Sequence, residues 1–153
     1  MASRDTTTGS NYEAIIEMCI KRSCEKNNLE AISQANIGIK PGGGKHRVDW
    51  EIIDKSDPNS RGLISCKYQG TSGTVEEKMA YEVIKLLYTM KLDSRYKKSW
   101  IIMGGEGWST GMREFINNHL SDWIPAMQNK VSILTTDQLI NLDLSLVLLS
   151  PLK

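Results

Sequence analysis

Hydrophobic residues recur along the chain with two different periods. In residues 10–26 and 74–92 they return every three or four positions, which predicts two amphipathic helices. Residues 34–39, 47–54 and 63–69 carry short, partly alternating apolar runs, which predict strands. The turn-forming sequence DKSDPNSRG separates the last two runs, so we expect them to pair as an antiparallel hairpin.

The second half of the chain repeats a strand-then-helix pattern. Residues 99–105 predict a buried strand that ends in glycine, and residues 112–119 predict a helix. Residues 131–134 predict another strand, followed by a last helix that starts at Thr135 or Thr136. The predicted order is helix, three strands, helix, strand, helix, strand, helix. This order is typical of an α/β fold, here a mixed β-sheet flanked by helices on both faces.

Length and composition are those of a small globular protein. The chain has 153 residues, 40% of them hydrophobic, which predicts one domain with its own core. We expect residues 1–9 to be a disordered tail and residues 10–153 to form the domain. The apolar C-terminal sequence LDLSLVLLSPLK predicts burial, either in the core or against a second subunit.

Charge and cysteine content exclude several classes of protein. A formal net charge of +1 is not that of a strongly basic, nonspecific nucleic-acid binder, although a local basic patch is compatible with it. The three cysteines have no metal-ligand spacing, which favours a reducing, cytoplasmic setting. No apolar run approaches the roughly 20 residues that span a bilayer, so we expect no membrane partner.

Two predicted strands carry an acid and a lysine where strands are usually apolar. Because side chains alternate between faces, Lys67 and Gln69 share one face of their strand, and Asp49 shares a face with Glu51. If the strands pair as a hairpin, Asp49, Lys67 and Gln69 lie together. A carboxylate suits a hard cation, and a lysine can orient or deprotonate water and neutralise charge on a phosphate. The pattern favours metal-assisted hydrolysis at phosphorus.

These residues and the order of the elements resemble the PD-(D/E)XK nuclease superfamily over about residues 9–134. By that resemblance Asp49 is the motif acid and Lys67 the motif lysine. Glu13 stands where many members carry a helix carboxylate, and Gln69 matches a K-x-Q extension found in some branches. The resemblance implies a restriction-endonuclease-like fold with these four residues as catalytic groups. It also implies Mg²⁺, or Mn²⁺ in its place, held by Asp49, Glu13 and Gln69.

One departure from the family pattern concerns the second motif acid. Ser65 occupies the position two residues before the lysine, so the motif is S-x-K. The missing carboxylate could come from another element, with Glu13 as the first choice and Glu76 or Glu77 next. Alternatively, the site uses a single metal ion, or the protein has lost catalysis.

Structural explanations compete with these roles. Asp49 and Lys67 could form a cross-strand ion pair. Glu13 has capping-box spacing after Ser10, and Glu77 has the same spacing after Thr74. We expect Glu51 to be a solvated or edge-facing acid.

Two loops could contact DNA phosphates. The sequence PGGGKHR runs directly into Asp49, so Lys45, His46 and Arg47 are candidates, with a flexible solvated loop as the alternative. Ser72 and Thr74 lie before a predicted helix N-terminus, where anions are favoured.

The function that this sequence favours is a metal-dependent endonuclease acting on double-stranded DNA, of restriction or homing type, in a prokaryotic or phage-like setting. Cutting both strands favours a homodimer or larger homo-oligomer, or pairing with a larger recognition subunit. The alternatives are a Holliday-junction resolvase or repair nuclease of the same fold, a noncatalytic DNA-binding subunit, and an α/β domain without a nucleic-acid role.

Overall fold

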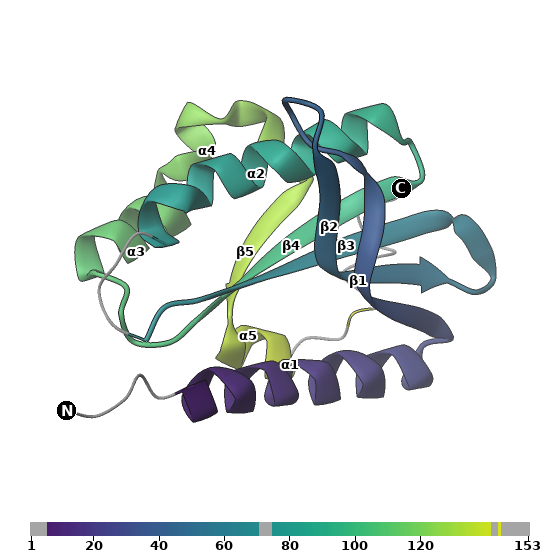
Figure 1. The fold of residues 1–153 in the computed structure, drawn as a ribbon, viewed down its shortest axis with the longest axis horizontal. Helices are drawn as coiled ribbons and strands as arrows, with labels where there is room; N and C mark the ends of the chain where they lie inside the picture. Colours follow the sequence, from purple (N-terminus) through teal and green to yellow (C-terminus); the bar gives the residue numbers. More distant parts are fainter. Residues whose placement is uncertain (1–5, 71–74, 142–143, 145–153) are drawn as a thin grey trace.

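A five-stranded mixed β-sheet lies between two layers of helices in the computed structural model, which describes residues 6–70, 75–141 and 144 (Figure 1). This arrangement confirms the predicted α/β architecture with helices on both faces. In chain order the elements are α1 (Thr6–Lys26), β1 (Leu29–Ile39), β2 (Lys45–Asp54), β3 (Asp57–Tyr68), α2 (Val75–Leu92), β4 (Tyr96–Gly104), α3 (Thr110–Asn118), α4 (Leu120–Trp123), the short 3-10 helix η1 (Pro125–Met127), β5 (Val131–Thr135) and α5 (Thr136–Asn141).

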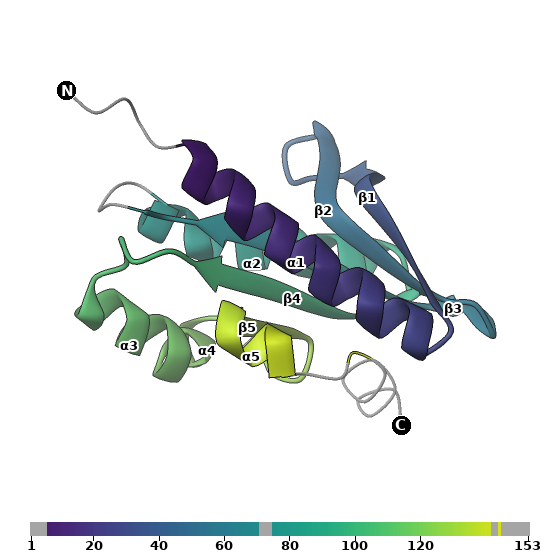
Figure 2. The same ribbon diagram turned by 90° about the horizontal axis from the view of Figure 1, so that it is seen from below.

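The strands follow one another in the sheet in the order of the sequence. β1 pairs with β2 and β2 with β3 in antiparallel fashion, so the predicted β2–β3 hairpin is confirmed. β4 and β5 then add in parallel, each after a helical crossover. Figures 1 and 2 show α1 and α5 on one face of the sheet and α2, α3 and α4 on the other.

Each face of the sheet has its own hydrophobic core. The α2-side core is formed by Ala35, Ile37, Val48, Leu63, Met79, Val83, Leu86, Met90, Tyr96, Ile101, Met103, Trp108, Ile116, Leu120, Met127 and Val131. The α1-side core is formed by Tyr12, Ile16, Ile20, Cys24, Leu29, Trp50, Ile52, Ile64, Trp100, Ile102 and Leu144. The central strands contribute to both cores, which is why they are apolar over most of their length.

Element boundaries differ from the predictions mainly at the N-terminal side. α1 begins at Thr6, so Ser10 lies inside the helix and the predicted capping box is wrong. β1 runs from Leu29 rather than from residue 34, because it pairs with β2 as far as Asp54. β3 already begins at Asp57, since the Asp54 carboxylate accepts hydrogen bonds from the backbone N and the hydroxyl of Ser56 and closes a turn shorter than predicted.

The β1–β2 pair changes face halfway along its length. Val48 packs in the α2-side core, whereas Trp50 and Ile52 pack in the α1-side core. Strict alternation along β2 would place these three side chains on one face, and the structure does not. The register between the strands is unbroken here, but Gln34, which lies across from Asp49, has a left-handed φ of 50°. The strands twist sharply at this point, and Asp49 lies where the ribbon crosses from one core to the other.

The chain ends are described only in part. Leu144 is buried in the α1-side core, and its backbone N donates to the Ser23 hydroxyl over 3.1 Å. Residues 6–9 of the predicted disordered tail belong to α1, so that part of the prediction is wrong. Residues 1–5, 142–143 and 145–153 lie outside the described residues, so disorder of residues 1–5 and burial of the C-terminal sequence stay predictions. None of the helices in the described ranges has the length and apolar character needed to cross a membrane.

Candidate active site

Lys67 near the end of β3 is paired with a buried acid on α2. Its Nζ lies 3.0 Å from Oε1 of Glu82, whose side chain is only 5% exposed. Leu63, two positions before Ser65, points toward α2, and alternation along β3 places Ser65 and Lys67 on the same side. A carboxylate from the helix that covers this face thus lies beside Lys67, on the side of β3 to which Ser65 also points. The competing prediction of an Asp49–Lys67 ion pair is not what the structure shows.

A second lysine holds the same carboxylate oxygen. Lys85, one turn further along α2, places its Nζ 3.0 Å from Oε1 of Glu82. Burial alone would raise the pKa of Glu82, but the charges and hydrogen bonds of Lys67 and Lys85 outweigh it and hold that pKa below its usual value. Glu82 is therefore ionised at neutral pH, and within the described part of the chain its Oε2 has no hydrogen-bond partner.

Asp49 approaches the same segment of β3 from the neighbouring strand. Its Oδ2 accepts a hydrogen bond of 2.7 Å from the backbone N of Cys66, the residue between Ser65 and Lys67. A carboxylate can bond this N–H because the β2–β3 ladder is paired only from Trp50 onward. Its Oδ1 has no hydrogen-bond partner among the described residues.

Glu13 on α1 is the next acid at this place. Burial raises the pKa of the Cys66 thiol, and the negative charges of Asp49 and Glu13 raise it further. Both carboxylates therefore lie close to Cys66. Glu13 follows Tyr12, whose hydroxyl donates to the Ile102 carbonyl over 3.0 Å and whose ring centroid is 5.0 Å from that of Tyr68. These contacts fix the first turns of α1 over the end of the sheet.

Gln69 is engaged by the protein and is not free to bind a metal. Its Oε1 accepts from the backbone N of Val75, and its Nε2 donates to Glu76 and to the Gly107 carbonyl. Glu76 also accepts from the backbone N and hydroxyl of Ser109. Gln69 and Glu76 thus tie the start of α2 to the loop after β4, and we withdraw both as metal ligands.

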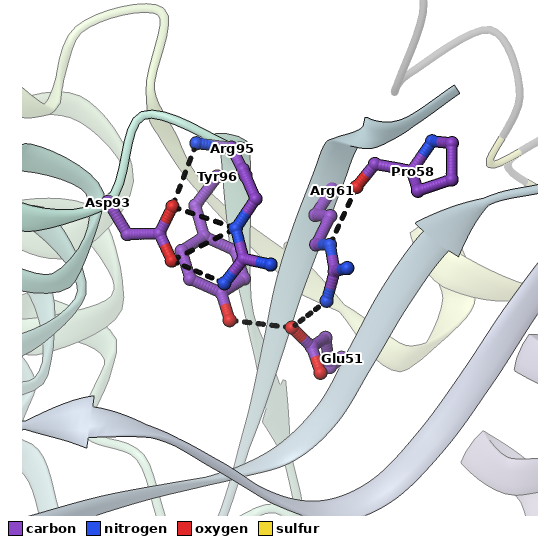
Figure 3. Close-up of polar contacts among 6 residues, drawn as sticks. All are labelled: Glu51, Pro58, Arg61, Asp93, Arg95 and Tyr96. Carbon is purple, nitrogen blue, oxygen red and sulfur yellow. Dashed lines mark hydrogen bonds and ion pairs between the residues drawn. The ribbon is translucent and has the colours of Figure 1, made fainter.

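Glu51 is not the solvated acid that the sequence predicts. Its carboxylate is buried, and Oε2 accepts a 2.6 Å hydrogen bond from the Tyr96 hydroxyl and a 3.2 Å ion pair from Arg61 (Figure 3). Next to it, Arg95 forms a bidentate pair with Asp93. This network ties β2, β3 and β4 together where β4 begins. Glu51 thus points to the face of Tyr96, opposite to the neighbouring Trp50, which packs in the α1-side core.

The predicted phosphate contacts separate into three groups. Lys45 and Arg47 are exposed on β2. His46 between them is 2% exposed, and its Nδ1 lies 2.8 Å from the Thr89 hydroxyl of α2, so it cannot contact DNA and this prediction is corrected. Ser72 and Thr74 lie outside the described residues.

A family model described as the PD-(D/E)XK nuclease superfamily domain matches residues 8–146. The chain belongs to the PD-(D/E)XK nuclease superfamily. This membership supports nuclease activity in general, and it agrees with the restriction-endonuclease-like order of elements. A search of curated proteins found no match to this chain.

PD-(D/E)XK nucleases generally use divalent metals, which need oxygen or nitrogen ligands from the protein. Within the described ranges, no three His, Cys, Asp or Glu side chains lie close enough together to form a ligand group. Mg²⁺, however, is typically bound by one or two carboxylates, with water and substrate phosphate completing its shell. Asp49 and Glu82 both lie against β3, and among the described residues each keeps one carboxylate oxygen without a hydrogen-bond partner, so each can offer an oxygen ligand.

Sequence reasoning missed Glu82, although a signal was present. The inward face of α2 is formed by Met79, Val83, Leu86 and Met90, and Glu82 interrupts this apolar stripe. An acid on a buried helix face needs a partner. Here the partners are Lys67 and Lys85, and the sequence spacing alone does not show the contact with Lys67.

Proposed function

We propose that the protein is a metal-dependent endonuclease that hydrolyses phosphodiester bonds in double-stranded DNA, most simply as a restriction- or homing-type enzyme. The observation that carries this proposal is the 3.0 Å pair between Lys67 and the buried Glu82, beside the Asp49 carboxylate at the Cys66 backbone. It supplies the acid that Ser65 lacks, so the S-x-K motif is compatible with catalysis.

Asp49 and Glu82 are the residues that would hold the metal, with Glu13 nearby to add negative charge. A bound Mg²⁺ would neutralise charge on the phosphate and lower the pKa of a bound water. Mn²⁺ offers similar oxygen coordination and should substitute.

Lys67 would act on the water and the phosphate. An ammonium has three N–H donors, and one is directed at Glu82. The other two can orient the attacking water and donate to a nonbridging phosphate oxygen, where negative charge grows in the transition state. The ion pair with Glu82 fixes the position of Nζ before substrate arrives, which reduces the reorganisation that the reaction requires.

The alanine variants of Asp49 and Lys67 test this assignment. Each should abolish cleavage of a DNA duplex while leaving binding to the same duplex within a few-fold of wild type, measured in chelator. Lys78→Ala, an exposed lysine on α2, is the matched control and should cleave normally. Wild-type cleavage by Asp49→Ala or Lys67→Ala would show that the site lies elsewhere.

The oligomeric form belongs to the same proposal. A single site of this kind cuts one strand, so a double-strand break requires two copies or a partner subunit. Sedimentation of the protein with and without a DNA duplex would distinguish a dimer from a monomer. A noncatalytic DNA-binding subunit is the outcome if the protein binds DNA and never cuts it.

A further inference from the structure

The outer half of the β1–β2 hairpin, residues 34–48, packs against α2 with one of its two faces. Ala35, Ile37 and Val48 pack into the α2-side core. His46 is buried beside them and bonds to Thr89 of α2. Figure 1 shows this part of β1 and β2 rising out of the plane of the sheet next to α2. The outer half of the hairpin is thus held in a fixed position relative to the helix that carries Glu82.

The opposite face of this outer half is polar and free of acids. Gln34, Asn36, Lys45 and Arg47 are all exposed. Asn36 and Arg47 are direct cross-strand neighbours. Residues 34–48 contain three cations and no Asp or Glu, whereas the sheet half of the hairpin carries Glu30, Asp49, Glu51 and Asp54.

This exposed face leads directly to the proposed catalytic acid. Lys45 and Arg47 alternate with the buried His46 and Val48, so they share one face of β2, and Asp49 follows them where the strand changes face. At roughly 3.4 Å per residue, Arg47 lies about 7 Å and Lys45 about 14 Å along the strand from Asp49. Neither side chain forms an ion pair with another described residue, so both cations are available to a ligand.

We infer that this outer face of the hairpin, defined by Gln34, Asn36, Lys45 and Arg47, binds the DNA strand that is cut, with Arg47 and Lys45 on phosphates to one side of the scissile bond. The inference rests on the proposed function and adds the direction from which the strand enters the site. A row of cations that ends at a catalytic carboxylate neutralises the phosphates that flank the reacting one and keeps acids away from them. Because the other face of the hairpin packs on α2, this surface is held in a fixed position relative to Glu82.

Salt-dependent binding tests the inference without requiring cleavage. Affinity for a fluorescent DNA duplex is measured by anisotropy in chelator, over a series of salt concentrations, for wild type, Lys45→Ala, Arg47→Ala and the double variant. Each lost phosphate contact should lower the slope of log affinity against log salt by about 0.9 and weaken binding several-fold. Lys55→Ala, which changes an exposed lysine in the turn just after β2, is the matched control and should bind as wild type does.

The outcomes separate this inference from the proposed function. Smaller salt slopes in the two hairpin variants, with Lys55→Ala unchanged, support it. Unchanged slopes in the hairpin variants of a protein that cuts DNA overturn the hairpin assignment alone. An equal loss in Lys55→Ala also overturns it, because the effect would then be one of total charge. A wild-type protein that neither binds nor cuts DNA overturns both. Thermal unfolding of each variant should match wild type, since the replaced side chains are exposed.

Discussion

At the scale of single residues, the chemistry depends on where one carboxylate comes from. The sequence predicts Asp49 and Lys67 from their residue types and their place in two adjacent strands. It shows a serine at position 65, where the superfamily motif has an acid, but it does not show that Glu82 lies beside Lys67. That contact depends on how α2 packs across β3, which is tertiary structure. Gln69 and His46 were misassigned for the same reason, because only the fold shows that their polar atoms bond to Val75 and Thr89.

The proposed role of Glu82, in place of an acid at residue 65, predicts that an acid introduced at residue 65 should rescue a Glu82 variant. Glu82→Gln should lower the cleavage rate by about 100-fold or more, since it removes the charge beside Lys67. Ser65→Asp in that background should restore part of the activity, because residue 65 lies on the same side of β3 as Lys67. Rates are measured under single-turnover conditions, with Glu77→Gln, an exposed acid on the same helix, as the control. Wild-type cleavage by Glu82→Gln would contradict the assignment and leave Glu13 as the candidate.

His46 predicts a pH dependence of stability. Burial first, and then the positive charge of Lys85, lower its pKa from 6.5, so the folded protein keeps it neutral. Below pH 6.5 the unfolded chain takes up a proton that the folded chain does not, and the free energy of unfolding falls until the pH reaches the lower, folded-state pKa. Lys40, Lys67 and Glu82 are the other charges that act on His46.

Chemical denaturation between neutral and mildly acidic pH measures this effect. His46→Asn should flatten the loss of stability just below pH 6.5. A His46→Asn profile as steep as that of wild type would show that another group causes the decline.

At the scale of elements, local pattern predicted the existence and type of nearly every helix and strand, but not their bends. The apolar periods of α2, β4 and β5 are strong, and their boundaries were close to those observed. The change of face at Asp49 could not be predicted from the sequence, because polar and apolar residues keep alternating along β2 there. The change follows instead from the twist of β1 at Gln34. That twist places Asp49 beside the backbone of β3 and explains why a cross-strand pair with Lys67 does not form.

The close packing of α1 against β4 predicts that one added methyl group strongly lowers stability. A Cβ at Gly104 would collide with the Tyr12 ring, so Gly104→Ala must displace the helix that carries Glu13. Such overpacking costs about 1–3 kcal/mol. Gly111→Ala, which meets open space within α3, should instead stabilise by about 0.5–1 kcal/mol. Thermal unfolding of the two variants measures both effects, and equal melting temperatures would contradict the described packing of α1.

At the scale of the whole molecule, the fold directs three acids that are far apart in sequence toward the last residues of β3, without forming one ligand cluster among the described residues. β2 delivers Asp49, α2 delivers Glu82, and α1 brings Glu13 near Cys66. The overall architecture was predictable because alternating strands and helices leave few compact arrangements. The site was predictable only as far as the superfamily motif extends.

The most direct test of this account is the incubation of purified protein with plasmid and long phage DNA, in magnesium or in chelator, beside Lys67→Ala. The account predicts discrete fragments from the wild-type protein in magnesium, and intact DNA in chelator or with Lys67→Ala. Intact DNA in every reaction, with protein shown to be folded and bound to the duplex, would contradict the nuclease assignment and identify a DNA-binding protein that has lost catalysis.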